Sequence, residues 1–254
     1  MDLPVNTFKA ALREGRVPVG LWCSSDDTGV AEMLAGCGYD WLLFDCEHAA
    51  LDPLRVLPLL QAVAPYPTHA MVRPSRLDEA EIKRLLDFGA QSILVPFVRT
   101  VAEAERAAAS VAYAPEGVRG LAGITRATRY GAVQEYAERA REEICLIVQV
   151  ETRDALDELE AIAAVPGVDA VFIGPADLAA SMGYRGEPSH PDVRAACVDA
   201  VQRLRRVGMP VGTLSLDHDL LAAMQAEGLA FAAIDVDLAI LRRGAMHRRT
   251  EWGA

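Results

Sequence analysis

An acidic segment directly follows one of the most apolar runs of the chain. The stretch FDCEHAALD, residues 44–52, holds three carboxylates and a histidine, and it comes after Trp-Leu-Leu at 41–43. A histidine next to carboxylates transfers protons near neutral pH, which predicts a catalytic role for His48. Asp45 and Glu47 fit two roles equally well, as groups that tune a metal site and as solvated loop acids.

Polar residues also end other apolar runs. Arg73 closes HAMVR, Gln149 and Glu151 close CLIVQVE, and Asp177 lies just after AVFIG. Glu151 and Asp177 offer two oxygen ligands to a hard divalent cation and leave positions for water and substrate, which favours Mg²⁺, Mn²⁺ or Co²⁺ over structural zinc. Arg73 can neutralise negative charge that develops on a carbonyl oxygen.

The segment GPADL, residues 174–178, predicts the start of a helix. Pro175 suits the first helical turn, and the amides of Ala176 and Asp177 then lie at the positive end of the helix, where they can hold a substrate carboxylate. Leu214 ends the run PVGTL and is expected to line the same pocket.

These residues need a scaffold that brings strand ends together. Short, continuous apolar runs alternate with amphipathic stretches of helical period in eight repeats, which suits buried parallel strands. Eight such units predict a single (β/α)8 barrel, with a doubly wound sheet as the second choice, and a barrel places catalytic groups where strands end. The predicted strands are residues 17–23, 41–45, 69–73, 92–96, 145–150, 170–174, 210–214 and 231–235.

Composition limits the class of protein. The 254 residues, 52% of them apolar, predict one barrel domain over 1–254 with an irregular insertion at about 114–133. A net charge of -11 argues against nucleic acid and anionic membrane as partners. The five cysteines show no C-x-x-C spacing, and neither a signal peptide nor a membrane span is recognisable, so a soluble protein of the reducing cytoplasm is expected.

Five segments together resemble a known family. FDCEHA, MVRP, LLDFGAQSILVP, CLIVQVET and VFIGPADLAASMGY are similar, in matching order, to segments of the metal-dependent (class II) pyruvate aldolases, the family of 4-hydroxy-2-oxoheptane-1,7-dioate aldolase. The resemblance implies a (β/α)8 barrel that uses a divalent metal to cleave 4-hydroxy-2-oxo acids to pyruvate and an aldehyde. It also implies a homohexamer, a trimer of dimers, with the last helix exchanged between partners.

The resemblance assigns roles residue by residue. A proton acceptor, a transition-state stabiliser and an acid that makes the acceptor more basic are matched by His48, Arg73 and Asp87 respectively. The matching metal ligands are Glu151 and Asp177, and the matching substrate-binding positions are Gln149 and Ala176. Asp87 ends the helix before the fourth predicted strand, which in one barrel lies opposite His48. A neighbouring subunit that brings its Asp87 to His48 would reconcile role and position, and a bent helix end is the alternative.

The chemistry itself argues for a metal. Cleavage between C3 and C4 of the substrate leaves an enolate, whose charge needs either a metal and a cation or a Schiff base on lysine. The lysines of the chain are Lys9 and Lys83, and neither ends a predicted strand. The Schiff-base route is therefore disfavoured.

Other polar residues have simpler expected roles. Cys46 is more typical of a small packing residue than of a nucleophile, and Asp26 and Asp27 are expected to cap the first barrel helix. His69 is expected to be structural. Interface ion pairs are favoured slightly over binding of a substrate's distal carboxylate for Arg119, Arg126 and Arg129.

Two other functions remain open. One is an acyl-CoA lyase of the related citrate lyase β type, although no basic patch for the coenzyme phosphates is obvious. The other is a barrel that binds keto acids without catalysis, which would have no need of His48. Asp235 replaces a glycine that the family commonly has and adds a carboxylate near the predicted mouth. The aldehyde that the enzyme accepts is therefore not given by the catalytic residues.

Overall fold

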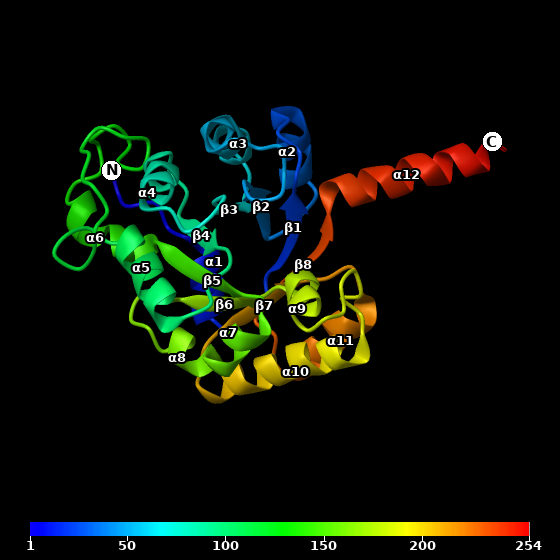
Figure 1. Ribbon diagram of the computed structural model, residues 1–254. Helices are drawn as coiled ribbons and strands as arrows, with labels where there is room; N and C mark the ends of the chain where they lie inside the picture. The colour runs from blue at the N-terminus through cyan, green and yellow to red at the C-terminus, as the bar shows by residue number, and fades with distance from the viewer. Residues whose placement is uncertain (254) are drawn as a thin grey trace.

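Eight parallel strands pair in chain order and close on themselves through β1 and β8 (Figure 1). The computed structural model describes residues 1–253. The closed sheet confirms the predicted (β/α)8 barrel, and the doubly wound alternative, which needs an open sheet, is wrong. Three strands have their predicted bounds and the others differ by one or two residues. The strands are β1 Val19–Cys23, β2 Trp41–Asp45, β3 His69–Arg73, β4 Ser92–Val95, β5 Cys145–Val150, β6 Ala170–Ile173, β7 Val211–Leu214 and β8 Phe231–Val236.

Helices follow the strands and pack around the barrel (Figure 1). Asp27 caps the first barrel helix as predicted, because its Oδ1 accepts from the Val30 amide at 2.9 Å, whereas Asp26 lies 3.4 Å from the Arg55 guanidinium instead. The helices are α1 Thr7–Arg13, α2 Thr28–Ala35, the short 3₁₀ turn η1 Pro53–Arg55, α3 Val56–Val63, α4 Glu79–Asp87, α5 Val101–Val111, α6 Tyr136–Glu143, α7 Arg153–Asp157, α8 Leu159–Ala163, α9 Pro175–Ser181, α10 Pro191–Arg206, α11 His218–Ala226 and α12 Asp237–Glu251.

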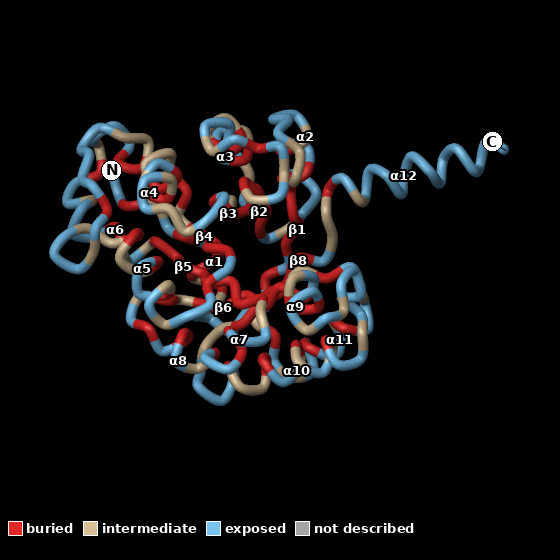
Figure 2. The backbone as a smooth tube through the Cα atoms, in the orientation of Figure 1, coloured by how far each residue is buried: buried red, intermediate tan, exposed pale blue. Residues whose placement is uncertain are grey.

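Alternate strand residues build two separate cores. Successive side chains of a strand point to opposite faces, so every second residue faces the barrel axis and the others face the helices. Trp41 and Leu43 of β2 belong to the inner cluster, while Leu42 and Phe44 belong to the outer one. The strands are buried along their length, as the red centre of Figure 2 shows. The same alternation decides which residues at the strand ends face the axis.

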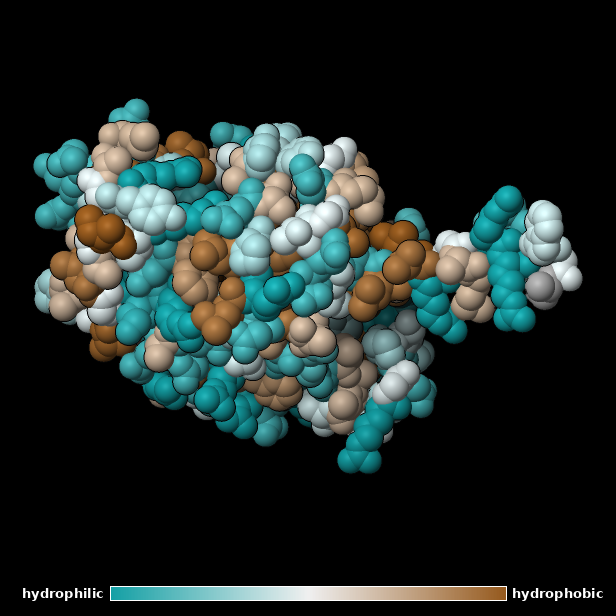
Figure 3. Space-filling view, turned by 90° about the horizontal axis from the view of Figure 1, so that it is seen from above, coloured by the Kyte–Doolittle hydropathy of each residue, from teal (hydrophilic) through white to brown (hydrophobic). Residues whose placement is uncertain are grey.

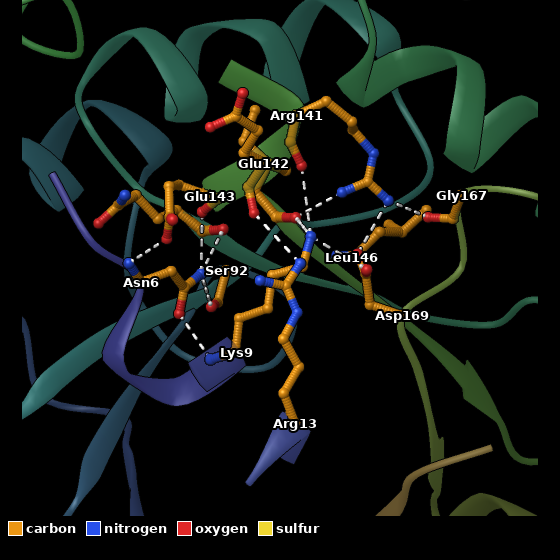
Figure 4. Close-up of polar contacts among 12 residues, drawn as sticks. Asn6, Lys9, Arg13, Ser92, Arg141, Glu142, Glu143, Leu146, Gly167 and Asp169 are labelled. Atoms are coloured by element: carbon orange, nitrogen blue, oxygen red, sulfur yellow. Dashed lines mark hydrogen bonds and ion pairs between the residues drawn. The ribbon is translucent and has the colours of Figure 1, made fainter. Parts of the chain in front are cut away.

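The amino end of the barrel is sealed by α1, a helix that the strand-helix repeat did not predict. Phe8 enters the inner cluster and packs edge-on against Trp41, with ring centroids 5.9 Å apart. Buried Asn6 donates from Nδ2 to Ser92 Oγ at 3.1 Å, and Lys9 Nζ lies 3.1 Å from an Asp169 oxygen (Figure 4). A closed floor leaves the carboxyl end as the open end of the barrel.

The segment from 114 to 133 is irregular apart from one bridge between Tyr113 and Arg119. It joins α5 to α6. Four of its large apolar side chains are exposed, namely Val118, Leu121, Ile124 and Tyr130. This surface is apolar although it faces solvent in the single chain.

Helix α12 projects from the body as an arm (Figures 1 and 2). Its first residue, Asp237, is buried and its carboxylate accepts from the amides of Ser24 and Ser25, both at 3.0 Å. The remainder carries exposed apolar side chains, and Figure 3 shows apolar surface where the arm leaves the body. These residues are Leu238, Ile240, Leu241 and Met246, and Trp252, which follows the helix, is exposed as well. Across residues 1–253 no helix combines the length and the apolar content that crossing a membrane requires.

Candidate active site

A pocket of about 650 Å³ lies at the carboxyl end of the barrel. It brings together all the site residues predicted from the sequence except Asp87. The predicted residues that line it are His48, Arg73, Gln149, Glu151, Ala176, Asp177 and Leu214. Apolar walls are added by Trp22, Phe172, Pro188 and Leu216, which the sequence did not single out.

The strand alternation explains why polar groups meet there. Asp45, Arg73 and Gln149 each lie two residues beyond an inner-cluster residue of the same strand, and they therefore face the barrel axis. Those inner-cluster residues are Leu43, Met71 and Ile147. The apolar inner face thus becomes polar at the carboxyl ends of β2, β3 and β5.

Arg73 is the centre of a buried network. Its Nε and Nη2 donate to the two oxygens of Asp45 at 2.8 and 2.7 Å. Its Nη1 lies 2.8 Å from Glu47 Oε2, and its guanidinium carbon lies 4.6 Å from the centroid of the Trp22 ring. A paired and stacked guanidinium of this kind is held in one orientation.

Asp45 is a structural partner of Arg73 and not a solvated loop acid. Only 2% of the residue is exposed, and Trp22 Nε1 donates to its Oδ2 at 3.1 Å. Burial alone would raise the pKa of Asp45, but the hydrogen bonds and charge of Arg73 hold it below its ordinary value. The strand periodicity of the sequence could have predicted this burial, since Asp45 follows Trp41 and Leu43 on the inner face.

Glu151 is a buried carboxylate without a cationic partner of its own among residues 1–253. It is 2% exposed, its Oε1 accepts from the Phe97 amide at 3.0 Å, and its Oε2 accepts from Gln149 Nε2 at 2.6 Å. Burial, with the charges of Asp177 and Glu47, raises the pKa of Glu151 to about 8. Phe97 has a left-handed backbone with φ of 53°, a loop conformation that sequence patterns did not predict.

Gly174 leaves room for the Glu151 side chain. A Cβ at position 174 would lie 2.5 Å from Glu151 Oε2 and 3.0 Å from Gln149 Nε2. The next residue, Pro175, begins α9 as predicted, so Ala176 and Asp177 lie in its first turn, where backbone amides lack partners within the helix.

The charges of this region fit a divalent cation. The region holds four carboxylates, and Arg73 pairs with two of them, Asp45 and Glu47. Burial together with the neighbouring acids raises the pKa of Glu47 above its ordinary value despite Arg73. The carboxylates are Asp45, Glu47, Glu151 and Asp177. Within residues 1–253 no group of three or more histidine, cysteine or acidic side chains forms a metal cage. Glu151 and Asp177 would offer carboxylate oxygens to a hard cation, which also accepts oxygens of water and substrate.

His48 lies at the edge of the pocket. Its side chain is 63% exposed, and its Nε2 is 3.8 Å from Glu47 Oε2, beyond hydrogen-bonding distance. Within the described part of the same chain, no carboxylate therefore accepts a hydrogen bond from the imidazole.

Asp87 lies apart from this pocket, at the end of α4. Arg119 Nη2 donates to its Oδ1 at 2.9 Å, so Arg119 forms its ion pair within the chain and the expected interface pair is wrong for this residue. Arg126 donates to the carbonyls of Phe88 and Leu60, and Arg129 is exposed. These three arginines do not line the active-site pocket of their own chain.

Five other residues with reactive or charged side chains do not line the pocket. Burial raises the pKa of the Cys46 thiol to about 12, which suits a packing residue and not a nucleophile. His69 is buried and shares a hydrogen bond of 2.8 Å with Ser92. Lys9 and Lys83 do not line the pocket. Asp235 pairs with Arg243 on α12 and does not line the pocket either, so the expectation that it adds a carboxylate to the mouth is wrong.

The chain is similar to known proteins over nearly its whole length. Residues 18–243 match the family model described as HpcH/HpaI aldolase/citrate lyase. The chain is 56% identical over 252 residues to the hydroxypyruvate/pyruvate aldolase of Sagittula stellata, covering 99% of this chain and 100% of that one. It is 47% identical over 241 residues to the 4-hydroxy-2-oxo-heptane-1,7-dioate aldolase of Klebsiella pneumoniae, covering 94% and 91%.

A solved structure extends the likeness to three dimensions. The crystal structure of an HpcH/HpaI aldolase/citrate lyase family protein from Burkholderia cenocepacia matches with a TM-score of 0.94 and 35% identity, over 98% of this chain and 100% of that one. The chain therefore belongs to the HpcH/HpaI aldolase/citrate lyase family, as its motifs predicted.

Proposed function

We propose that the protein is a divalent-metal-dependent aldolase that cleaves 4-hydroxy-2-oxo acids to pyruvate and an aldehyde, or joins these products. The observation that carries this proposal is the meeting of Glu151 and Asp177 with Arg73 and Gln149 in one pocket at the carboxyl end of the barrel. The name of the relative from Sagittula stellata supports pyruvate as one reactant.

Glu151 and Asp177 would hold the metal. A divalent cation bound there would act as a Lewis acid on the 2-oxo group of the substrate. Mg²⁺, Mn²⁺ and Co²⁺ are the candidates, because all accept carboxylate oxygen ligands. Gly174 has no side chain and therefore leaves the space that the Glu151 carboxylate occupies.

The chain's own residues account for the substrate orientation and the proton transfers. Gln149 and the first-turn amides of Ala176 and Asp177 would bind the carboxylate end of the 2-oxo acid. His48 would accept the proton of the C4 hydroxyl group, whereupon the bond between C3 and C4 breaks and its electron pair forms the pyruvate enolate.

Arg73 would stabilise the negative charge that appears on the enolate oxygen. Its orientation is already set by Asp45 and by the Trp22 ring, so little reorganisation is needed as charge develops. Return of the proton from His48 to C3 would yield pyruvate and complete the cycle.

The pocket walls favour a small acceptor. Trp22, Phe172, Leu214 and Leu216 make much of the wall apolar, and among the described lining residues Arg73 is the one lysine or arginine. Three phosphates of a coenzyme would find little positive charge there, which supports an aldolase over an acyl-CoA lyase. The position of a base, His48, at the pocket edge supports catalysis over simple keto-acid binding.

The proposal includes an assembly of several copies, a homohexamer built as a trimer of dimers. The exposed apolar residues of α12 and of the 114–133 segment supply surface for contacts between copies. In such an assembly Asp87 of one protomer would reach His48 of its neighbour, supplying the hydrogen-bond acceptor that His48 lacks within its own chain. The five free cysteines fit a reducing compartment, and we place the protein in the cytoplasm.

A direct test is pyruvate release from a panel of 4-hydroxy-2-oxo acids that differ in the length and charge of the aldehyde portion. The protein should release pyruvate, lose this activity in EDTA and regain it on addition of Mg²⁺, Mn²⁺ or Co²⁺. Tight binding of 2-oxo acids without turnover of any panel member would support the keto-acid-binding alternative instead.

A further inference from the structure

Arg119 is a buried charge held in an unusual way. Its side chain has no exposed surface, and its Nη2 donates to Asp87 Oδ1 at 2.9 Å. Its Nε and Nη1 are buried as well, and neither has a hydrogen-bond partner within residues 1–253. Leaving buried donors of a charged group unpaired lowers stability, so simple anchoring of a loop is a poor explanation for an arginine here.

Aromatic rings and the local turn fix the guanidinium. Its carbon lies 4.5 Å from the centroid of the Tyr113 ring and 5.9 Å from that of Tyr136. The Arg119 amide donates to the Ala112 carbonyl at 2.9 Å, which joins this part of the 114–133 segment to the end of α5. The ring contacts of the side chain and the hydrogen bond of the main chain therefore both fix the position of the guanidinium.

Asp87 is fastened to the same segment at two points. Its side chain binds Arg119, and its backbone carbonyl accepts from the Ala127 amide at 3.2 Å. The side chain is 19% exposed, and within the described chain its Oδ2 has no hydrogen-bond donor. One carboxylate oxygen is therefore fixed and the other is available.

We propose that Arg119 is a positioning residue that fixes Asp87 through Oδ1 and leaves Oδ2 to accept a hydrogen bond from the His48 imidazole of another protomer. This inference rests on the proposed function, in which Asp87 acts on His48 between subunits. The irregular 114–133 segment would then contribute to catalysis, because its Arg119 side chain and its Ala127 amide both bind Asp87.

The pH profile of kcat/KM distinguishes a positioning role of Arg119 from a structural one. The informative part is the acid limb, in which kcat/KM falls with decreasing pH. A general base must be unprotonated, so kcat/KM falls as the pH drops through its apparent pKa. A carboxylate aligned with an imidazole raises that apparent pKa, and loss of the alignment moves the acid limb to lower pH. A residue needed only for folding changes the amount of active protein and not the position of the limb.

The experiment compares Arg119→Gln, Arg119→Lys, Asp87→Asn and the double variant Arg119→Gln/Asp87→Asn as full-length chains. Arg119→Gln should lower kcat/KM about 10- to 100-fold and move the acid limb in the same direction as Asp87→Asn. The double variant should be no slower than Asp87→Asn alone, because both changes remove one function. Arg119→Lys keeps the charge but loses the fork geometry, so it should be more active than Arg119→Gln. It also keeps the test valid if the Gln variant does not fold.

Arg141→Gln is the matched control. Arg141 also pairs with an aspartate, Asp169, at 2.9 Å, but this pair lies at the amino end of the barrel (Figure 4). The acid limb of the kcat/KM profile of Arg141→Gln should stay at the same pH as in the unmodified protein, even if the variant is less stable. A shift in Asp87→Asn without one in folded Arg119 variants would overturn the Arg119 proposal alone. An unchanged profile in Asp87→Asn would overturn both this inference and the proposed role of Asp87.

Discussion

Gly174 lies so close to Glu151 that any side chain at position 174 would collide with the carboxylate. The Cβ of an alanine there would be 2.5 Å from Glu151 Oε2 and 2.9 Å from Glu151 Cβ. Gly174→Ala is expected to displace Glu151 and weaken Mg²⁺ or Mn²⁺ binding, with a fall in kcat/KM of about 10- to 100-fold. Isothermal titration with the metal alone and steady-state kinetics measure the two effects.

Gly36→Ala provides the control for this substitution. Gly36 is exposed, has an ordinary φ of -79°, and its added Cβ would have 3.4 Å to its nearest neighbour. This variant should bind metal and turn over like the unmodified protein. Normal metal affinity in Gly174→Ala would contradict the assignment of Glu151 as a ligand.

Arg73→Lys is expected to lower kcat about 10²-fold while KM changes much less. Lysine keeps the positive charge opposite Asp45, which protects the fold, but it cannot reproduce the two-point pairing that orients Arg73. Because enolate charge is greatest near the transition state, the loss appears in kcat. Arg99→Lys, at an exposed pair with Glu103, is the control. A rise in KM with unchanged kcat would mean that Arg73 only binds substrate.

Mixing two severely impaired variants tests whether Asp87 acts between protomers. His48→Ala and Asp87→Asn should each be severely impaired, whereas a mixed assembly can pair an intact His48 of one chain with an intact Asp87 of another. Activity should therefore return when differently tagged variants exchange subunits, and co-purification of both tags verifies the exchange. Failure of activity to return in verified mixed assemblies would place the action of Asp87 within its own chain or away from His48.

His69 is predicted to make the fold less stable in mild acid. Burial lowers the pKa of His69 to about 4, so between about pH 6.5 and pH 4 the unfolded chain binds a proton that the folded chain does not. The free energy of unfolding should fall through this window, with about 2 kcal/mol lost between pH 7 and pH 5 from this residue.

Urea unfolding at both pH values measures that loss. His69→Gln removes the titrating group and should show a smaller difference between pH 7 and pH 5, whereas His218→Gln, at the exposed start of α11, should behave like the unmodified protein. An equal pH dependence in His69→Gln would show that His69 is not the source.

The barrel and most of the pocket could be predicted because both follow from repeated local patterns. The run WLLFD is apolar until Asp45, and the alternation of a strand places that acid on the same face as Trp41 and Leu43. The helix α1 was missed because it follows no strand, and it is defined by tertiary contacts such as that of Phe8 with Trp41. Likewise, the amide of Phe97 reaches Glu151 only because its loop adopts a positive φ, which no spacing of residue types encodes.

If Glu151 and Asp177 bind a divalent metal that lets the protein form the enolate of pyruvate, the C3 protons of pyruvate should exchange with solvent. Exchange of the C3 protons of pyruvate for deuterium in D₂O, followed by proton NMR, measures this step without any aldehyde. Exchange should be rapid with Mg²⁺ and at least about 10²-fold slower in EDTA or in Asp177→Asn, and the rate of the unmodified protein should recover when Mg²⁺ is restored. Exchange that continues at the same rate in metal-free protein and in Asp177→Asn would mean that no metal on Glu151 and Asp177 is needed to form the enolate.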